Sequence, residues 1–420
     1  MKQERVITSA DFMNHAKWFS TLNKVWKRTY SNGAAPLLNK DELIRTARRK
    51  SGLHDLGKDF WDEPLDRLCE SYNHEARLHP IGNFITFKRL MNLLNVRLRA
   101  EHWFKEFPEI LEQEVYPPTV IAGLQRTGTT KLHRLLTADP DNRVLRSWEA
   151  LNPAPFKVNG TLEDKRIRIA RISEKALRWM TPGFFAIHPV EHLAPEEDIL
   201  LLDVSFLSTT PEATSHVPSY SSWLEKTDQS LAYAYGSKLL RLLQWQQPGR
   251  HWVLKSPHHL EFFPLIEKYY GHPHLIWTHR DPAECIPSFL SMVCHSRALF
   301  SDEVLTSQVS DHWVRKTAYM LEKALSYRQD GANHTNFTDI MYEDLVSDPM
   351  GQLEKIYERY DGISENLRQR FKRADAENPK GKYGRHGYNL SDFGLSREEL
   401  IHKNRSYLNL FNTLRGPTGD

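Results

Sequence analysis

Apolar residues recur at helical spacing through the first part of the chain. The stretch Lys40–Leu56 has the pattern of a capped amphipathic helix. Between Ile85 and Phe104, four leucines follow the helical period: Leu90, Leu93, Leu94 and Leu98. Arginine and lysine residues alternate with these leucines, which is typical of a solvated helix face. We therefore expect residues 1–115 to form a helical extension that packs on the rest of the chain.

The pattern changes after Pro117 and Pro118. Thr119–Leu124 is a short apolar run, partly β-branched, and a polar glycine-containing loop and a helical run, Thr130–Thr137, follow it. Three more short apolar runs lead into polar loops: His251–Leu254, His274–Thr278 and Phe337–Tyr342. Strands that alternate with helices predict parallel βαβ units, so we expect residues 116–420 to form a three-layer α/β sandwich. Ligands of such sheets bind beyond the carboxyl ends of the strands, where these polar loops lie.

The segment Asp375–Leu395 is rich in Gly, Lys, Arg and Asn. Residues of these types favour turns and solvent, so we expect a long surface loop here rather than an element of the core.

Composition narrows the class of protein. The chain has 56 basic and 53 acidic residues and a net charge of +3, too balanced for a protein that coats nucleic acid, so nucleic acid is not an expected partner. The same balance argues against coating an anionic membrane, and any anion site must be local. The three cysteines match no zinc, redox or disulfide spacing and indicate a reducing compartment. Residues 1–10 lack the apolar run of a signal peptide, and Ile199–Leu207 is too short to span a membrane, so we expect a cytoplasmic protein.

The segment Gly123-Leu-Gln-Arg-Thr-Gly-Thr-Thr130 carries the most chemical information. A strand that leads through a glycine-bearing turn into a helix directs backbone N–H groups and the helix dipole at one point, which makes an anion site. Arg126, Thr129 and Thr130 add side-chain donors. The glycine spacing is that of a nucleoside-triphosphate loop, but Thr129 stands where that loop needs lysine. This weakens the alternative of a kinase or NTPase, for which Asp281 is the residue able to hold magnesium.

Arg126-Thr127-Gly128-Thr129-Thr130 resembles the 5′-phosphosulfate loop of the sulfotransferases that use 3′-phosphoadenosine 5′-phosphosulfate (PAPS). Cytosolic members more often have lysine at the position of Arg126 and an aromatic residue at that of Lys131. The resemblance implies a central parallel sheet of the P-loop type, PAPS as co-substrate, and no metal. It assigns donor binding to Arg126, Thr127, Gly128, Thr129 and Thr130.

The resemblance continues through the second half of the chain. His279–Ser288 is similar to the family's 3′-phosphate motif, in which an arginine and a serine eight residues later bind one phosphate; here these are Arg280 and Ser288. Met341–Pro349 matches a segment whose tyrosine, here Tyr342, contacts the adenine. Pro379–His386 resembles the C-terminal basic loop that closes over the 3′-phosphate, with Lys380, Gly381 and Arg385 as candidates. The segment His386–Leu395 is similar to the bacterial branch of the superfamily.

The resemblance leaves two solutions for the general base. Lys255 matches the lysine of the family's Lys-Thr-His segment, and with Arg126 it is expected to stabilise charge on the leaving phosphate. Pro257 occupies the family's histidine position, so His258 or His259 is one candidate base. Glu149 is the other candidate base. It follows a strand, as the glutamate base does in the branches of the family that act on tyrosine or sugars.

A further polar cluster, His192 and Pro195–Asp198, precedes an apolar run. Acidic residues at such a place are most often a helix N-terminus, although this region and the aromatic residues Trp179, Phe184 and Phe185 are also candidates for an acceptor pocket. Together these patterns predict a sulfotransferase that acts on a hydroxyl of a small-molecule or lipid-like acceptor. The alternatives are a P-loop kinase or NTPase and a non-catalytic nucleotide-binding member; the sequence indicates no oligomeric state.

Overall fold

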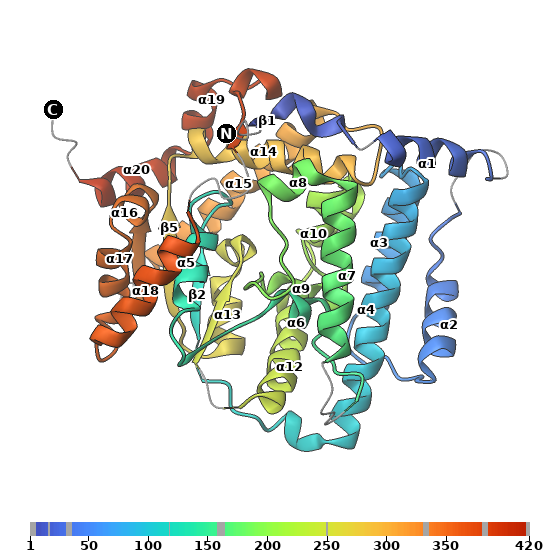
Figure 1. Ribbon diagram of the computed structural model, residues 1–420, viewed down its shortest axis with the longest axis horizontal. Coiled ribbons are helices and arrows are strands. Elements are labelled where there is room, and N and C mark those ends of the chain that lie inside the picture. The colour runs from blue at the N-terminus through green and yellow to red at the C-terminus, as the bar shows by residue number, and fades with distance from the viewer. Residues whose placement is uncertain are drawn as a thin grey trace.

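The computed structural model describes residues 6–15, 17–30, 36–116, 118–157, 164–248, 251–330, 336–379 and 385–416. Its centre is a five-stranded sheet of order β3-β4-β2-β5-β6, in which every neighbouring pair is parallel (Figure 1). The strands are β2 (Thr119–Ala122), β3 (Asn142–Val144), β4 (His251–Lys255), β5 (His274–His279) and β6 (Phe337–Met341). The predicted parallel sheet is confirmed.

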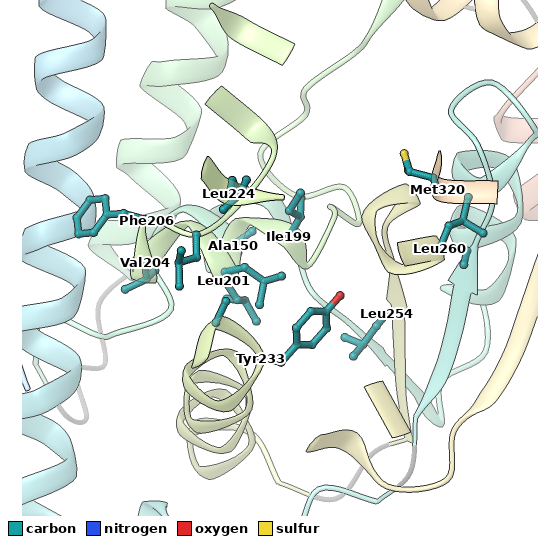
Figure 2. Packing of buried hydrophobic residues seen from close by; sticks show 14 of the residues in the cluster. Ala150, Ile199, Leu201, Val204, Phe206, Leu224, Tyr233, Leu254, Leu260 and Met320 are labelled. Atoms are coloured by element: carbon teal, nitrogen blue, oxygen red, sulfur yellow. The ribbon is translucent and has the colours of Figure 1, made fainter. Parts of the chain in front are cut away.

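Alternate residues of the central strands enter two separate apolar clusters. Val120 of β2 and Leu254 of β4 belong to the larger cluster, part of which Figure 2 shows, whereas their neighbours Ile121 and Val253 belong to the second. Successive side chains of a strand point to opposite faces, so the two clusters lie on the two faces of the sheet. Helices supply the rest of each cluster, which confirms the predicted three-layer α/β sandwich.

Helices make up most of the remaining structure. In the N-terminal part they are α1 (Lys17–Lys27), α2 (Lys40–Ser51), α3 (Asp62–His74) and α4 (Pro80–Glu106). The middle of the chain contains α5 (Thr129–Leu136), α6 (Ser147–Leu151), α7 (Lys165–Met180), α8 (Pro182–Ile187), α9 (Ile199–Leu202), α10 (Thr210–Thr214), α11 (Pro218–Leu224), α12 (Ser230–Gln246) and α13 (Phe263–Tyr270). The last part contains α14 (Pro282–Ala298), α15 (Thr306–Gln329), α16 (Tyr342–Ser347), α17 (Pro349–Tyr357), α18 (Glu365–Glu377), α19 (Arg397–Lys403) and α20 (Arg405–Arg415).

The extra N-terminal helices are present as expected and share the core of the sheet. Leu90 and Leu94 of α4 are buried in the same cluster as Val120 of β2. Helix α2 ends earlier than predicted because Gly52 adopts the left-handed conformation (φ 70°) that terminates helices. Helix α4 begins earlier because the ring nitrogen Nδ1 of His79 accepts a hydrogen bond from the backbone of Gly82 and caps it.

The expectation of a long surface loop over Asp375–Leu395 is wrong for the described residues. Helix α18 continues to Glu377, and Arg385–Gly387 forms strand β7. This strand pairs in parallel with β1 (Val6–Thr8), far away in sequence. Phe393 is buried in the larger cluster. The local pattern could not show this, because the partners come from the other end of the chain.

Candidate active site

The loop between β2 and α5 is held tightly against the neighbouring strand. A Cβ atom on Gly123 would lie 2.1 Å from Oγ1 of Thr278 in β5, so only glycine fits. Gly128 (φ 92°) precedes α5, and a Cβ atom there would lie 3.2 Å from the ring of Tyr342. Arg126 has a positive φ of 72°, which a non-glycine residue adopts only when its surroundings hold it there. The turn therefore brings the N-terminus of α5 and Arg126 to the carboxyl edge of the sheet.

The side chain of Thr127 points into the protein rather than toward a ligand. Its hydroxyl donates to the carbonyl of Leu124 and contacts Oγ1 of Thr278, each at 2.6 Å, and the residue is buried. The hydroxyl of Thr127 therefore fixes the loop to β5, and donor binding by this residue stays a prediction. Thr129 and Thr130, which follow it, line the pocket at this edge.

Three motifs that are distant in sequence converge here. Nε of Arg126 donates to Oγ of Ser288 in α14 at 3.0 Å, and Arg280 donates to the carbonyl of Arg126 at 3.1 Å. The guanidinium carbon of Arg280 lies 4.1 Å from the centre of the Tyr342 ring, and a second interaction joins Arg280 to Glu284. The structure therefore brings these side chains together near the ends of β5 and β6, as the sequence predicted.

Arg126 has the electrostatic character of an anion-binding residue. Burial lowers the pKa of its guanidinium, and the nearby charge of Arg280 acts in the same direction. Within the described part of the chain, no carboxylate forms an ion pair with Arg126. A partly buried cation without a carboxylate partner is stabilised when an anion binds beside it.

These groups surround a cavity of about 200 Å³, which we call the polar pocket. Its lining residues are Gln125, Arg126, Gly128, Thr129, Thr130, His188, Glu197, Pro257, Arg280, Met292 and Tyr342. A second cavity of about 290 Å³, the apolar pocket, adjoins it. The residues that line both pockets are Gln125, His188, Glu197, Pro257 and Met292. The two cavities therefore meet along a shared wall, as the sites of two reacting molecules must.

The apolar pocket extends away from this wall toward α10 and α15. Its apolar lining includes Phe184, Ile199, Leu200, Ala213, Phe289, Val293 and Met320. Two buried ring nitrogens on lining residues, Nε2 of His258 and Nε1 of Trp313, have no hydrogen-bond partner among the described residues. Burial lowers the pKa of His258, so its ring is neutral at neutral pH.

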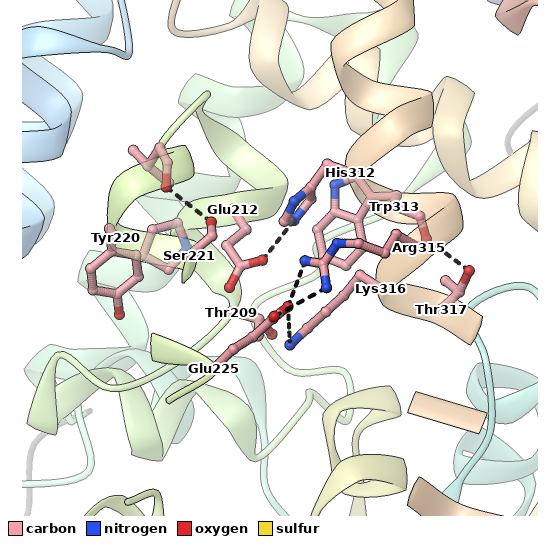
Figure 3. A network of polar contacts seen from close by, with 12 residues as sticks. Thr209, Glu212, Tyr220, Ser221, Glu225, His312, Trp313, Arg315, Lys316 and Thr317 are labelled. Atoms are coloured by element: carbon pink, nitrogen blue, oxygen red, sulfur yellow. Dashed lines mark hydrogen bonds and ion pairs between the residues drawn. The ribbon is translucent and has the colours of Figure 1, made fainter. Parts of the chain in front are cut away.

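A network of charged residues surrounds Lys316, which lines the apolar pocket (Figure 3). Nζ of Lys316 lies 3.0 Å from Glu261 and 3.3 Å from Glu225, and Arg315 also pairs with Glu225. Burial raises the pKa of Glu261 to about 7, against the opposing effect of Lys316. His312 pairs with Glu212 on the adjacent helix α10. The network joins α10, α11 and α15 and fixes the position of Lys316 at the pocket wall.

Glu197 is the carboxylate placed where the pockets meet. Its Oε1 accepts from Nζ of Lys255 at 2.6 Å, while a quarter of its side-chain surface stays accessible. Lys255 itself is buried behind Glu197 and lines neither pocket. The neighbouring Glu196 lines only the apolar pocket, and burial raises the pKa of its carboxyl. Burial lowers the pKa of His188, which lines both pockets, to about 4.

Two predicted bases are committed to other contacts. Glu149 pairs with Arg143 at 2.9 Å and accepts from the backbone of Arg146 at 3.0 Å; it is buried and lines neither pocket. The ring of His259 contacts Asp198 through Nε2 at 2.9 Å and the hydroxyl of Tyr233 through Nδ1. These contacts disfavour both residues as the base, because neither side chain lines a cavity, and both assignments stay predictions.

Some residues expected at the site lie outside the described part of the chain, and some residues that line the pockets were not expected from the sequence. Lys380 and Gly381 are outside the described residues, and Arg385 is described only as part of β7. Sequence reasoning missed His188, Met292 and Gln125. Gln125 stands inside the phosphate loop, so its place was a usable signal, whereas His188 ends α8 with no motif around it.

The described residues contain no group of three or more His, Cys, Asp or Glu side chains able to hold a metal ion. Among these same residues, no helix is both long enough and apolar enough to cross a membrane.

Comparison with known proteins gives consistent matches. A family model described as "Sulfotransferase family" matches residues 117–362. The sulfotransferase Stf3 of Mycobacterium bovis, named for omega-hydroxy-beta-dihydromenaquinone-9, is 26% identical over 252 residues, which are 58% of this chain and 62% of that relative. This chain therefore matches less than two thirds of that relative's length.

Two crystal structures of mycobacterial sulfotransferases resemble the whole fold. STF1 from Mycobacterium tuberculosis has a TM-score of 0.78 and 29% identity, with 89% of this chain and 100% of that one covered. STF9 from Mycobacterium avium has a TM-score of 0.79 and 25% identity, with 89% and 96% covered.

Proposed function

Because this chain belongs to the sulfotransferase family, we propose that it transfers a sulfuryl group from PAPS to the hydroxyl of an apolar, lipid-like alcohol. The observation that carries this proposal is the convergence of Arg126 and Arg280 at a polar pocket that adjoins an apolar one, with Ser288 buried against Arg126. Such an arrangement suits an anionic donor and an apolar acceptor that must meet at one wall.

The polar pocket suits the two anionic ends of the donor. Arg126 and the N-terminus of α5 would hold the 5′-phosphosulfate, where backbone N–H groups and a partly buried cation favour negative charge. Arg280 would bind the 3′-phosphate with Ser288, whose hydroxyl accepts from Arg126 and keeps its own hydrogen to donate. Tyr342 would contact the adenine. Lys380, Gly381 and Arg385 keep the role of a closing basic segment that their resemblance implies.

The reaction is an in-line displacement at sulfur. The acceptor oxygen forms a bond to sulfur, the bond from sulfur to the 5′-phosphate oxygen breaks, and adenosine 3′,5′-bisphosphate leaves with that electron pair. Glu197 takes the proton of the acceptor hydroxyl, because it is the carboxylate on the wall shared by both pockets. Lys255 holds the Glu197 carboxylate in place through its ion pair. Arg126 stabilises the charge that develops on the leaving phosphate.

The acceptor class follows from the second pocket. A cavity of about 290 Å³ with a mainly apolar lining excludes water and favours an apolar body that carries a hydroxyl. The unpartnered nitrogens of His258 and Trp313 add hydrogen-bonding positions for a second polar atom of the acceptor. The name of the relative Stf3 specifies a hydroxylated menaquinone, which supports a lipid-like alcohol here.

Cysteine chemistry supports a cytoplasmic enzyme. Cys69, Cys285 and Cys294 are all free and buried. Burial raises the pKa of each thiol to about 12, so none is a reactive thiolate at neutral pH. The three cysteines act as small apolar core residues, and a reducing compartment keeps their thiols from being oxidised.

Calorimetric titration with adenosine 3′,5′-bisphosphate tests the donor site. We expect tight binding that does not need magnesium, and Arg280→Ala should weaken it by roughly 10- to 100-fold, because a charge-assisted hydrogen bond contributes about 1.5–3 kcal/mol. Arg373→Ala is the matched control, since Arg373 is an exposed arginine of α18 that pairs with Glu377.

Two results would contradict the proposal. A preference for ATP with magnesium would favour a kinase or NTPase. Bisphosphate binding without turnover of PAPS against a panel of apolar alcohols would indicate a non-catalytic member. Turnover that needs the apolar body of the alcohol would support the assignment of the second pocket.

A further inference from the structure

The net charge of the chain is nearly balanced, but its basic and acidic residues are unevenly distributed along the sequence. Residues 17–30 contain four basic and no acidic residues, and residues 164–180 contain six basic and two acidic ones. These two segments together carry +8, whereas the whole chain carries +3, so the remainder carries −5. The first segment contains α1 and the second contains α7, and these two helices lie next to each other.

Stacked tryptophans join the two helices. The rings of Trp18 in α1 and Trp179 in α7 lie 3.8 Å apart and nearly parallel, although Trp179 is 64% exposed. Figure 1 shows α1 beside the end of α7 that leads into α8. On its inner side, α1 is fixed to the protein by the buried side chains of Phe19 and Asn23, the latter accepting from the backbone of Ile81.

The outer side of α1 is apolar as well as basic. Trp18, Leu22 and Val25 recur at positions i, i+4 and i+7 and therefore share one face, on which Leu22 is 43% and Val25 is 53% exposed. On α7, Ile172 and Trp179 are seven residues apart and both are exposed, and the exposed residues Arg168 and Lys175 lie on the same side. Large exposed apolar side chains on adjacent helices are uncommon on proteins that have no partner there.

We propose that this α1/α7 face docks on the surface of a membrane that contains anionic lipids. The interface of such a membrane binds exposed tryptophan and aliphatic side chains that have lysine and arginine around them. The apolar side chains enter below the lipid headgroups, and the lysine and arginine side chains pair with the anionic headgroups. The acids nearby do not oppose this: Glu174 is occupied by His192 and Arg178, and Asp164 by Arg166. No spanning helix is required.

The face also adjoins the acceptor site. Helix α8 follows α7 directly, and Phe184 within it and His188 at its end line the apolar pocket. Docking through α1 and α7 therefore places one wall of that pocket near the membrane, from which a lipid-like alcohol can enter. The docking itself depends only on the surface residues, so it can hold or fail independently of the proposed activity.

Vesicle sedimentation with the full chain tests the proposal. Vesicles of 70% phosphatidylcholine and 30% phosphatidylglycerol should bind the protein at least about tenfold more strongly than pure phosphatidylcholine, and 0.5 M salt should remove most of the difference. Val25→Glu should lower binding at least about tenfold, because it places a carboxylate on the docking face. Val346→Glu is the matched control, a similarly exposed valine (41%) on α16. Lys24→Glu with Lys27→Glu tests the charge separately, and unchanged thermal unfolding of each variant excludes misfolding.

Three outcomes would overturn the inference. One is no binding to either vesicle. Another is an equal loss of binding for Val25→Glu and Val346→Glu. The third is self-association of the chain that Val25→Glu abolishes while vesicles do not bind, which would assign the face to a second copy of the protein.

Discussion

Replacing Glu197 with glutamine tests the assignment of the general base most directly. The substitution keeps the shape of the side chain and a hydrogen-bond acceptor for Lys255, 2.6 Å away, but removes the group that takes the proton. A positioned general base contributes about 10²- to 10⁴-fold, which corresponds to about 2.7–5.4 kcal/mol of activation free energy. We therefore expect the rate of sulfuryl transfer to fall by that factor.

The loss of the ion pair must be separated from the loss of the base. Lys255 is buried, so removing the opposing charge also lowers the free energy of unfolding, by about 1–3 kcal/mol, since the amide still accepts a hydrogen bond and Glu197 is partly exposed. Single-turnover measurements with saturating donor report the chemical step, and chemical denaturation reports stability. Affinity for adenosine 3′,5′-bisphosphate should change by less than about threefold, because glutamine keeps the shape of the site.

Two neighbouring carboxylates serve as matched controls. Glu196→Gln should leave the single-turnover rate at saturating acceptor nearly unchanged, because Glu196 does not line the polar pocket and glutamine keeps the oxygen that accepts from the backbone of Glu197. Glu149→Gln should lower stability by about 3 kcal/mol, since it breaks the buried pair with Arg143, but should leave transfer intact. If Glu197→Gln keeps most of its transfer rate while Glu149→Gln loses it, our reasoning is refuted and the base is Glu149.

The remaining predictions concern the acceptor pocket and acid stability. Phe184→Ala should lower kcat/KM for apolar alcohols by roughly tenfold with unchanged bisphosphate affinity, because it removes part of the pocket wall; an equal loss for small polar alcohols would contradict this. Burial lowers the pKa of His133 to about 3 and of His188 to about 4, below the ordinary 6.5. The unfolded chain therefore binds more protons, and stability should fall as pH drops from 6.5 toward 4, by up to about 1.4 kcal/mol per pH unit for each histidine. Denaturation at pH 7, 6 and 5 measures the slope, and a His133→Gln variant whose slope equals that of the parent would count against this cause.

The sequence alone was sufficient to predict those parts of the site in which the positions of the residues depend on their local spacing. Arg280 directly follows strand β5, and Ser288 lies eight residues later in the next helix, α14. Parallel strands have their carboxyl ends at one edge of the sheet, so this edge is where both residues are expected. The convergence with Arg126 followed from that rule. The P-loop-like turn was also predictable from the glycine spacing, and the structure gives its reason: a Cβ atom on Gly123 would collide with Thr278, and Gly128 has a positive φ.

Local spacing could not show the direction in which each side chain points. Thr127 and His259 lie in the expected segments, yet both turn inward because Thr278 and Asp198 offer buried partners. Glu149 caps the short helix α6 instead of facing the donor. The sequence left Glu197 either at a helix N-terminus or at an acceptor pocket; α9 does begin just after it, and its side chain also lines both pockets. These differences depend on contacts between distant segments, which a single sequence does not display.

The pairing of β1 with β7 has a consequence for how the protein is made. Val6 is aligned with Arg385, so β1 pairs with a segment that is synthesised 379 residues after it. Because closing so long a stretch of chain is entropically unfavourable until the intervening domain is compact, this two-stranded sheet forms only after most of the core. During synthesis, the edge of β1 therefore has no partner until β7 has been made, and in that interval it is able to pair with another chain.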